Sequence, residues 1–309
     1  MPPPANMAFI ARAVRHARGA AQVPRRRTPV LAERLPYQHE FHAGNFADVM
    51  KHTVLLLLLQ RMGDKESPFT YVETHAGAGS YDLIAGKAAR LNEQADGIEL
   101  LLNLADRDGL SSLPAPAQTL VEMSRGREYP GSPRIAAEQL RPQDSLLLCE
   151  LAPEPHAQLC RCSPIDALIA DGRARVLCAD GYKAVRLRDG EAAAGPHKTP
   201  WKTQKTPQKR PRALVLIDPP YQMGGDTERI VQLVGHLARH WRSARVAIWL
   251  PIRDDGRRAT SVASPVSPHH STPAPLYPPT HLYRAARMYE QLAALDVPGD
   301  ILVAELVGG

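Results

Sequence analysis

The sequence predicts an α/β protein built on a parallel sheet, and two observations lead to this prediction. Six short runs rich in β-branched residues or leucine alternate with stretches of helical periodicity along the 309 residues. The first four runs are each followed by glycine, proline or acidic residues, as at the ligand-binding ends of parallel strands. The longest apolar run, Val54 to Leu59, is far shorter than the roughly 18–20 residues of a membrane-spanning helix. A hydrophobic content of 44% is near that of an average globular protein, so the composition excludes the membrane-spanning class.

The elements follow one another in an order that fits such a sheet. Asn45 is suited to cap a helix that continues to Arg61, with Asp48 at the capping-box position. Residues 82–128 are mostly helical in pattern and too long for an ordinary crossover, so we expect a helical insertion there. The predicted strands are Phe69–Thr74, Leu146–Glu150, Ala174–Cys178, Ala213–Ile217, Val246–Leu250 and Ile301–Leu306. The apolar face predicted for the first helix includes Phe46, Val49, Met50 and Leu57.

The formal net charge of +6 comes from two tracts rather than from the body of the chain. Residues 1–35 hold seven Arg and one acid, and residues 191–212 hold six Lys or Arg and one acid, which leaves 25 basic and 30 acidic residues elsewhere. The first tract is a disordered extension, a targeting peptide or the product of a wrongly chosen start codon. The second is a basic loop, either solvated or facing RNA. Residues 251–280, with seven prolines, are expected to be a disordered insertion in a single domain over 36–309.

The four cysteines indicate a reducing compartment. Their spacing is not that of a zinc site, and Cys149 and Cys178 lie in apolar runs typical of core thiols. A cytoplasmic protein is therefore expected, with an organelle as the alternative if residues 1–35 are a transit peptide.

The motif Asp218-Pro219-Pro220-Tyr221 directly follows a predicted buried strand. This position places an acid and an aromatic ring at the mouth of a ligand site, where they suit methylation of an exocyclic amine. The N6 lone pair of adenine is delocalised into the ring and is a poor nucleophile. The Asp218 carboxylate and the Pro219 carbonyl could each accept one N–H and hold the nitrogen in a more tetrahedral state, while Tyr221 stacks on the base. The structural alternative is an ordinary proline-containing turn with an N-cap aspartate.

The loop Glu73 to Tyr81 contains a glycine turn at Gly77-Ala78-Gly79 between a strand and a helical pattern. Such a turn lets the backbone approach a ligand, but a dinucleotide fingerprint would need a third glycine where Asp82 stands. The loop alone could be a simple βα turn; together with the Asp218 motif it indicates an S-adenosylmethionine site. Glu150 and Asp180-Gly181 follow the next strands, where acids can accept the ribose hydroxyls and meet the adenine amino group.

Three histidines lie near the first helix at positions 39, 42 and 52. Their spacing matches no recognised metal pattern, so no metal is expected. Taken alone, each is interpreted as a surface or packed residue.

These residues together resemble a known family. The stretch H-x-F-H-A-G-N-x-A-D-V-x-K-H at 39–52, T-H-A-G-A-G at 74–79, P-G-S-P at 130–133, A-D-G at 179–181 and I-D-P-P-Y at 217–221 look like the ribosomal large-subunit methyltransferase J family. The family methylates N6 of an adenine in bacterial large-subunit (23S-type) ribosomal RNA, using S-adenosylmethionine. The resemblance implies a class I, Rossmann-like methyltransferase sheet with a small helical subdomain.

The resemblance also implies roles for individual residues. Asp218 would be the catalytic residue, Tyr37 would touch the RNA beside Tyr221, and Lys51 is a lesser candidate for the cofactor. The residues expected to contact the cofactor are His52, His75, Ser132, Glu150, Asp180 and Gly181.

The sequence departs from the family in several places. Gln38 stands where the family has an arginine, and the tracts 1–35, 191–210 and 251–280 look foreign to the family. The family's last antiparallel strand is expected to be missing, so the strand at 301–306 must pair directly with the strand at 246–250 or expose an apolar edge. The expected substrate is ribosomal RNA, protein-free or in early assembly, bound by a monomer without a membrane. A DNA adenine-N6 methyltransferase and a non-catalytic RNA-binding relative are the alternatives.

Overall fold

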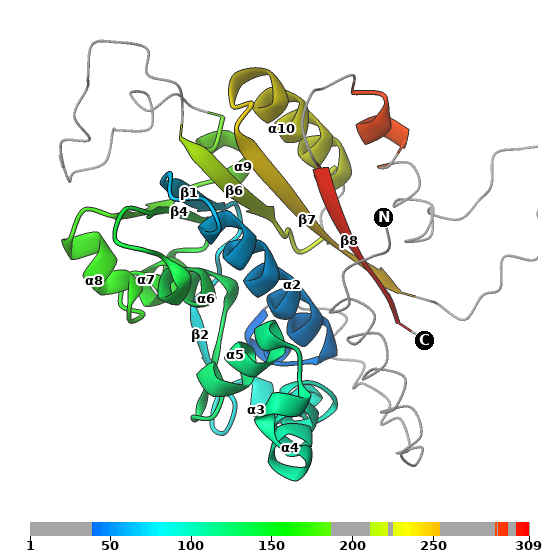
Figure 1. Ribbon diagram of the computed structural model, residues 1–309. Coiled ribbons are helices and arrows are strands. Elements are labelled where there is room, and N and C mark those ends of the chain that lie inside the picture. Colours follow the sequence, from blue (N-terminus) through cyan, green and yellow to red (C-terminus); the bar gives the residue numbers. More distant parts are fainter. Residues whose placement is uncertain are drawn as a thin grey trace, which may run out of the picture.

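The computed structural model describes residues 39–186, 211–221, 225–253, 288, 290–295 and 301–308 (Figure 1). Its centre is a six-stranded sheet in the order β5-β4-β1-β6-β7-β8, in which every pair of neighbours is parallel. All six predicted strands are confirmed. Their bounds are β1 Phe69–Glu73, β4 Ser145–Glu150, β5 Ala174–Cys178, β6 Arg212–Ile217, β7 Ala244–Arg253 and β8 Ile301–Gly308.

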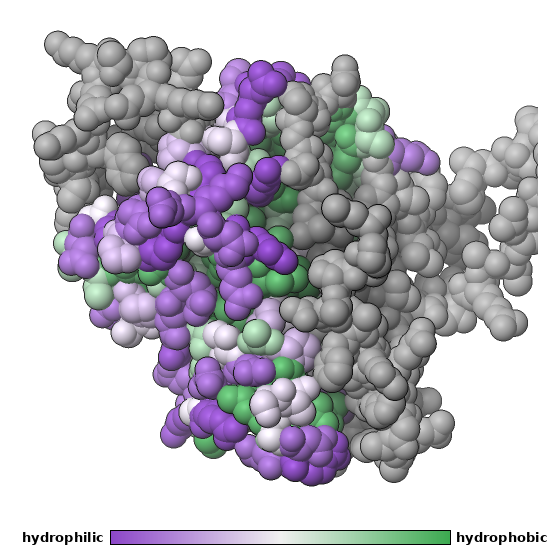
Figure 2. Space-filling view, in the orientation of Figure 1, coloured by the Kyte–Doolittle hydropathy of each residue, from purple (hydrophilic) through white to green (hydrophobic). Residues whose placement is uncertain are grey.

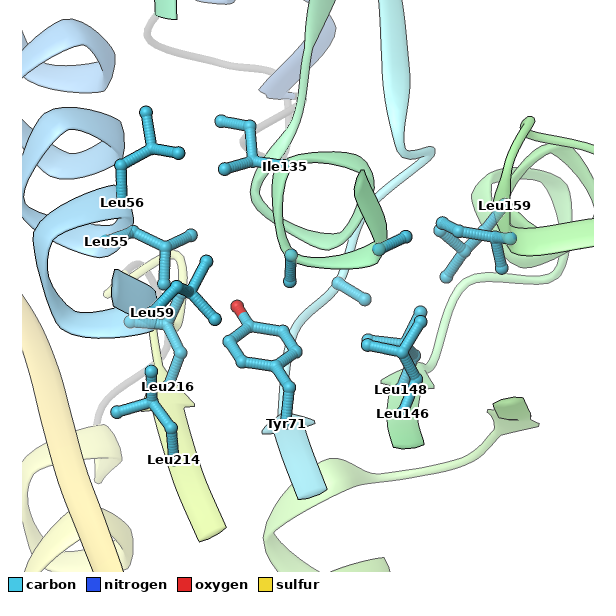
Figure 3. Close-up of a cluster of buried hydrophobic side chains, with 14 of the residues drawn as sticks. Leu55, Leu56, Leu59, Tyr71, Ile135, Leu146, Leu148, Leu159, Leu214 and Leu216 are labelled. Carbon is cyan, nitrogen blue, oxygen red and sulfur yellow. The ribbon is translucent and has the colours of Figure 1, made fainter. Parts of the chain in front are cut away.

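Helices cover both faces of this sheet, because consecutive residues of the central strands point to opposite faces and are apolar on both. In β1, Tyr71 belongs to one core and Val72 to the other, and in β6 Leu214 and Val215 alternate in the same way. Figure 3 shows Tyr71 between leucines of β6 and β4, below Ile135. The helices of the first core are α2 Phe46–Gly63, α6 Ser132–Gln139, α7 Pro153–Leu159 and α8 Ile165–Ala170, and those of the second are α9 Gly181–Ala184 and α10 Asp226–His240.

Helix α2 begins as predicted but buries a different face. The side chain of Asn45 accepts a hydrogen bond from Asp48 N at 3.0 Å, which confirms the N-cap, and the helix continues to Gly63 rather than Arg61. The predicted apolar residues Phe46, Val49, Met50 and Leu57 are only half-buried. The fully buried face carries Asp48, Lys51, His52, Thr53, Leu55, Leu56, Leu59 and Met62. The prediction of this face was wrong because its first two turns are polar, and apolar periodicity cannot detect a polar buried stripe.

Residues 82–128 are mostly helical, and a short ribbon that the sequence did not indicate joins them to the sheet domain. Strands β2 Ser80–Asp82 and β3 Glu128–Pro130 pair antiparallel, so the insertion leaves and returns at one place. Between them lie α3 Ala88–Leu91, η3 Glu93–Asp96, α4 Ile98–Asp108, η4 Leu110–Ser112 and α5 Ala115–Met123. A small core of Ala105, Leu113, Ala117 and Val121 holds α4 and α5 together. The segment before α2 contains the 3-10 turn η2 His39–Phe41.

Strand β8 pairs directly with β7 over eight residues, which is the first of the two arrangements expected for the strand at 301–306. This pairing extends β7 to Arg253, so residues 251–253 belong to the sheet and not to a disordered insertion. Pro251 obscured this extension in the sequence. It is tolerated because β6 pairs with β7 only as far as Ile248, which leaves β7 with a partner on one side beyond that point.

Two further sequence expectations need correction. Cys178 is exposed rather than a core thiol, because it ends the edge strand β5, whereas Cys149 in β4 is buried. Arg212 belongs to β6 and not to the basic loop, and its guanidinium donates to the carbonyls of Met62, Lys65 and Ser67. Residues 1–38, 187–210 and 254–280 lie outside the described residues, as does the predicted RNA contact Tyr37. Among the described helices, none is long and apolar enough to cross a membrane.

Replacing Arg212 by methionine should lower the free energy of unfolding by about 2 kcal/mol, because the charged donor that holds the α2–β1 connection is lost. Urea unfolding measures the change. The control is Arg61→Met, which removes a 69% exposed side chain and should cost under about 0.5 kcal/mol. If Arg212→Met leaves the free energy of unfolding unchanged but weakens RNA binding, Arg212 belongs to an RNA-facing loop instead.

Candidate active site at the carboxyl edge of the sheet

The acidic residues singled out in the sequence meet at one edge of the sheet. In the register of the central strands, Glu73 pairs with Leu148 of β4 and with Leu216 of β6. Glu150 and Asp218 therefore each stand two residues beyond the level of Glu73. Glu150 pairs in turn with Cys178 of β5, and Asp180 follows two residues later. The parallel register thus brings together side chains that lie far apart in the sequence.

The glycine turn after β1 is fastened to the end of β4. Ala76 N donates to the carbonyl of Cys149 at 2.9 Å, and Gly77 N donates to Glu150 Oε2 at 2.8 Å. Gly77 has φ +65°, and a Cβ atom there would lie 2.4 Å from the Tyr81 hydroxyl, so only glycine fits. The other Glu150 oxygen accepts from Ala152 N at 2.8 Å. Glu150 is therefore held by two backbone donors, and its oxygens retain further acceptor capacity for a ligand.

The loop after β5 touches the loop after β1. A Cβ atom on Gly181 would lie 2.1 Å from the carbonyl oxygen of Thr74, which explains why glycine stands at this position. Asp180 caps α9 by accepting from Tyr182 N at 3.1 Å, and Arg229 of α10 donates to its other oxygen. The structure thus places Gly181 against Thr74, at the start of the loop that leads into the glycine turn.

His75 and His52 are neutral histidines on either side of this edge. Burial lowers the pKa of His75 to about 4, although the charge of Asp218 opposes the shift. His75 Nδ1 lies 2.8 Å from Thr74 Oγ1, and its ring meets Tyr182 edge-on. Burial lowers the pKa of His52 to about 3. His52 Nδ1 lies 2.8 Å from the Tyr129 hydroxyl, whereas its buried Nε2 has no hydrogen-bond partner among the described residues.

A chain of charges connects Asp218 to helix α2. Lys51 Nζ lies 2.7 Å from Asp218 Oδ2 and 3.1 Å from Asp48 Oδ1. Asp48 Oδ2 in turn accepts from Gly44 N at 3.0 Å and lies 3.2 Å from His39 Nε2. Within the described part of the chain, Asp218 Oδ1 makes no hydrogen bond. The sequence predicted Asp48 only as a capping residue. No sequence pattern indicates that its side chain is buried beside Lys51.

The charge state of Asp48 follows from its neighbours. Burial favours the protonated carboxyl, but the attraction of His39 and Lys51 and the hydrogen bond from His39 outweigh it, so the pKa lies well below its ordinary value. Asp48 is therefore an anion that balances the buried Lys51 ammonium. A single positive charge is shared between two carboxylates, one in α2 and one after β6.

Glu73 is a buried acid that the sequence analysis did not assign to the site. Ser132 Oγ donates to its Oε1 at 2.5 Å and the Tyr71 hydroxyl donates to its Oε2 at 2.9 Å. Burial raises the pKa of Glu73 to about 8, since it outweighs these hydrogen bonds and the attraction of Lys51. Ser132, expected at the cofactor, thus stands at the first turn of α6 with its hydroxyl on Glu73. One sequence feature could have assigned Glu73 to the site: it is an acid at the end of the first strand, just before the glycine turn.

Tyr221 lies close to Asp218 with its backbone in the left-handed region, φ +55°. Its hydroxyl donates to the carbonyl of Trp249 in β7 at 2.6 Å, and its half-buried ring packs against the second core. The ring is therefore anchored at its polar end beside the acid.

The donor set suits an organic ligand with hydroxyl and amino groups. It offers the Glu150 and Asp180 side chains, neutral imidazoles and the Nε2 of His52. Among the residues that the structure describes, no group of three His, Cys, Asp or Glu side chains is arranged to hold a metal ion. These observations fit S-adenosylmethionine at the ends of β1, β4 and β5.

The chain is similar to known proteins over most of its length. Residues 66–261 match the model of the family described as RsmJ, Ribosomal RNA large subunit methyltransferase D, RlmJ. The chain is similar to the Ribosomal RNA large subunit methyltransferase J of Escherichia coli K12, with 36% identity over 71% of this chain and 70% of that protein. It is 35% identical to the enzyme of the same name from Haemophilus influenzae, with the same coverage. A crystal structure of protein LPL1258 from Legionella pneumophila superposes with a TM-score of 0.57 at 25% identity, covering 82% of this chain and 76% of that one.

Replacing Glu73 by glutamine should change how stability depends on pH. Wild-type Glu73 keeps its proton in the folded state up to about pH 8 but releases it near 4.5 when unfolded, so its contribution to stability falls as the pH rises through this window. Glutamine stays neutral throughout. The stability advantage of Glu73→Gln over wild type should therefore grow by about 1.4 kcal/mol per pH unit between pH 5 and 8.

Urea unfolding of both proteins at several pH values measures this difference. The buried histidines are common to both proteins and cancel in the comparison. A difference that stays constant across the window would mean that Glu73 is ionised in the folded state.

Proposed function

This chain belongs to the family of ribosomal RNA large subunit methyltransferase J, and on that premise we propose that Asp218 is its catalytic residue. The protein is an S-adenosylmethionine-dependent methyltransferase that modifies N6 of an adenine in large-subunit ribosomal RNA. The observation that carries the assignment is the 2.7 Å contact between Lys51 Nζ and Asp218 Oδ2, because it fixes the carboxylate at the sheet edge. Asp218 Oδ1 is then available to accept one N–H of the target amine.

The chemistry needs positioning more than a strong base. With one N–H on Asp218 and the other on the carbonyl of Pro219, the adenine nitrogen is held with its lone pair free of the ring. Lys51 keeps the carboxylate from rotating, and Asp48 keeps Lys51 in place. Tyr221 would stack on the base, supported by its hydrogen bond to the carbonyl of Trp249. Tyr37 is proposed as a second contact to the RNA.

The cofactor residues are proposed from the same geometry. S-adenosylmethionine supplies an electrophilic methyl group on a sulfonium. Glu150 would accept the hydrogen bonds of the ribose hydroxyls, Asp180 would accept from the adenine amino group, and Gly181 lets the loop after β5 approach the loop after β1. The remaining contacts are assigned to His52, His75 and Ser132, of which His52 offers its buried Nε2.

The oligomeric state, the nucleic-acid substrate and the compartment are also proposed. We propose that the enzyme acts as a monomer on protein-free or early-assembly ribosomal RNA. The four cysteines are free, which supports a reducing, cytoplasmic setting. A DNA adenine methyltransferase would use the same amine chemistry; the names of the two relatives favour ribosomal RNA. The intact Lys51–Asp218 pair argues against a non-catalytic relative.

Replacing Asp218 by alanine should reduce methyl transfer by about a thousandfold or more, because the acceptor that positions N6 is lost. The dissociation constant of S-adenosylmethionine should stay within about twofold of wild type. A labelled-methyl assay and calorimetry measure the two quantities. Asp171→Ala, which removes an exposed acid at the end of α8, is the control. An active Asp218→Ala variant would refute the assignment.

The substrate class is tested by offering the same enzyme two substrates. Deproteinised ribosomal RNA from cells lacking the protein should take up the labelled methyl group, and duplex DNA rich in adenine should not. Digestion to nucleosides should give N6-methyladenosine as the product. Preferential labelling of the DNA would establish the DNA alternative.

A further inference from the structure

The segment His39–Asn45, called here the strap, lies between helix α2 and the helical insertion. Its backbone is fastened to the start of α4, where Ile98 N donates to the carbonyl of Gly44 at 2.8 Å. A Cβ atom on Gly97 would lie 2.1 Å from that same oxygen, so the two backbones are in direct contact. Lys87 binds the other end of the strap, with Nζ 2.8 Å from Glu40 Oε2. The insertion therefore contacts the strap near both of its ends, at Glu40 and at Gly44.

Glu93 makes the central contact between the insertion and the strap. Its Oε2 lies 2.9 Å from His42 Nδ1 and accepts from Asn45 Nδ2 at 3.0 Å. One carboxylate oxygen of the insertion thus holds two side chains that precede α2. The partners are about 50 residues apart in the sequence, and neither composition nor periodicity indicates their contact.

This contact fixes the orientation of the Asn45 amide. With Nδ2 on Glu93, the amide oxygen faces the helix and accepts from Asp48 N at 3.0 Å. The same turn of α2 carries Asp48, whose carboxylate holds Lys51, and Lys51 holds Asp218. A continuous series of hydrogen bonds and ion pairs therefore leads from the insertion to the catalytic carboxylate.

We propose that Glu93 is a positioning residue for methyl transfer, through which the insertion sets the start of α2 and hence the place of Lys51 and Asp218. The proposal rests on the proposed function of Asp218. In this proposal the insertion binds no substrate. It holds the strap in the conformation in which Lys51 fixes the Asp218 carboxylate.

The charge of the insertion supports this task. Residues 82–128 contain eight acidic and five basic residues, whereas a surface built to bind phosphates needs an excess of Lys and Arg. On the face that Figure 2 shows, the insertion, at the bottom of the view, mixes hydrophilic and apolar residues. Two of its charged groups, Glu93 and Lys87, are used on the strap.

The first test is the variant Glu93→Ala. It should lower kcat for methyl transfer about tenfold or more and leave the dissociation constant of S-adenosylmethionine within about twofold of wild type, because Glu150 and Asp180 are untouched. The matched control is Glu99→Ala, which removes an exposed acid from α4 and should leave kcat unchanged.

The second test reverses the direction of the hydrogen bond. Asn45→Asp alone keeps a good N-cap but sets a carboxylate against Glu93, so kcat should fall. Adding Glu93→Gln supplies an amide that donates to the new carboxylate at position 45, and kcat should recover by about threefold or more over Asn45→Asp. Circular dichroism and the unfolding midpoint show whether the single and the double variant are folded to the same extent. If they are, a merely structural role of Glu93 would not produce this recovery of kcat.

The outcomes separate this inference from the proposed function. Wild-type kcat in Glu93→Ala, or a double variant no more active than Asn45→Asp, would overturn the positioning role while methylation by the wild type stands. If Glu93→Ala does not fold, the exchange between positions 45 and 93 decides alone. A wild-type enzyme that transfers no methyl group to RNA would overturn the proposed function, and the inference with it.

Discussion

The ion pair between Lys51 and Asp218 is the contact on which the rest of the site depends. Lys51 is 7% and Asp218 19% exposed, so both charges are largely removed from water. Such a pair is stable only when further partners compensate the lost hydration. Asp48 supplies the second carboxylate, and it is itself held by Gly44 N and His39. The strap holds Asp48 through Gly44 N and His39, the N-cap Asn45 binds Asp48 N, and the insertion holds Asn45 through Glu93.

Three titratable groups of the edge are neutral near pH 7. His75 and His52 are unprotonated and Glu73 is protonated, in each case chiefly because of burial. Asp48, by contrast, is held as an anion by His39 and Lys51. The neutral groups leave the side chains of Glu150 and Asp180 as acceptors for a ligand.

The sequence predicted the sheet and most of the site because both depend on local patterns. Apolar runs give the strands, and the acids and glycines that follow them gather at one edge whatever the intervening loops do. It could not predict the polar stripe of α2, because periodicity analysis looks for apolar residues. The β2–β3 ribbon is too short to leave a pattern, and the contact of Glu93 with Asn45 depends on how the insertion folds back. The cofactor roles came from the resemblance and stay predictions.

Strand β8 lies beyond most of the site. In the described sheet it pairs only with β7, whereas the acids of the site stand at the ends of β1, β4 and β5, and Asp218 follows β6. One contact crosses this separation, since the Tyr221 hydroxyl donates to the carbonyl of Trp249 in β7, and Trp249 pairs with Ala304 of β8. The direct β7–β8 pairing therefore bears on how firmly the ring for the target base is held. The carboxylates that would hold the cofactor are separated from β8 by whole strands, so their geometry does not depend on it.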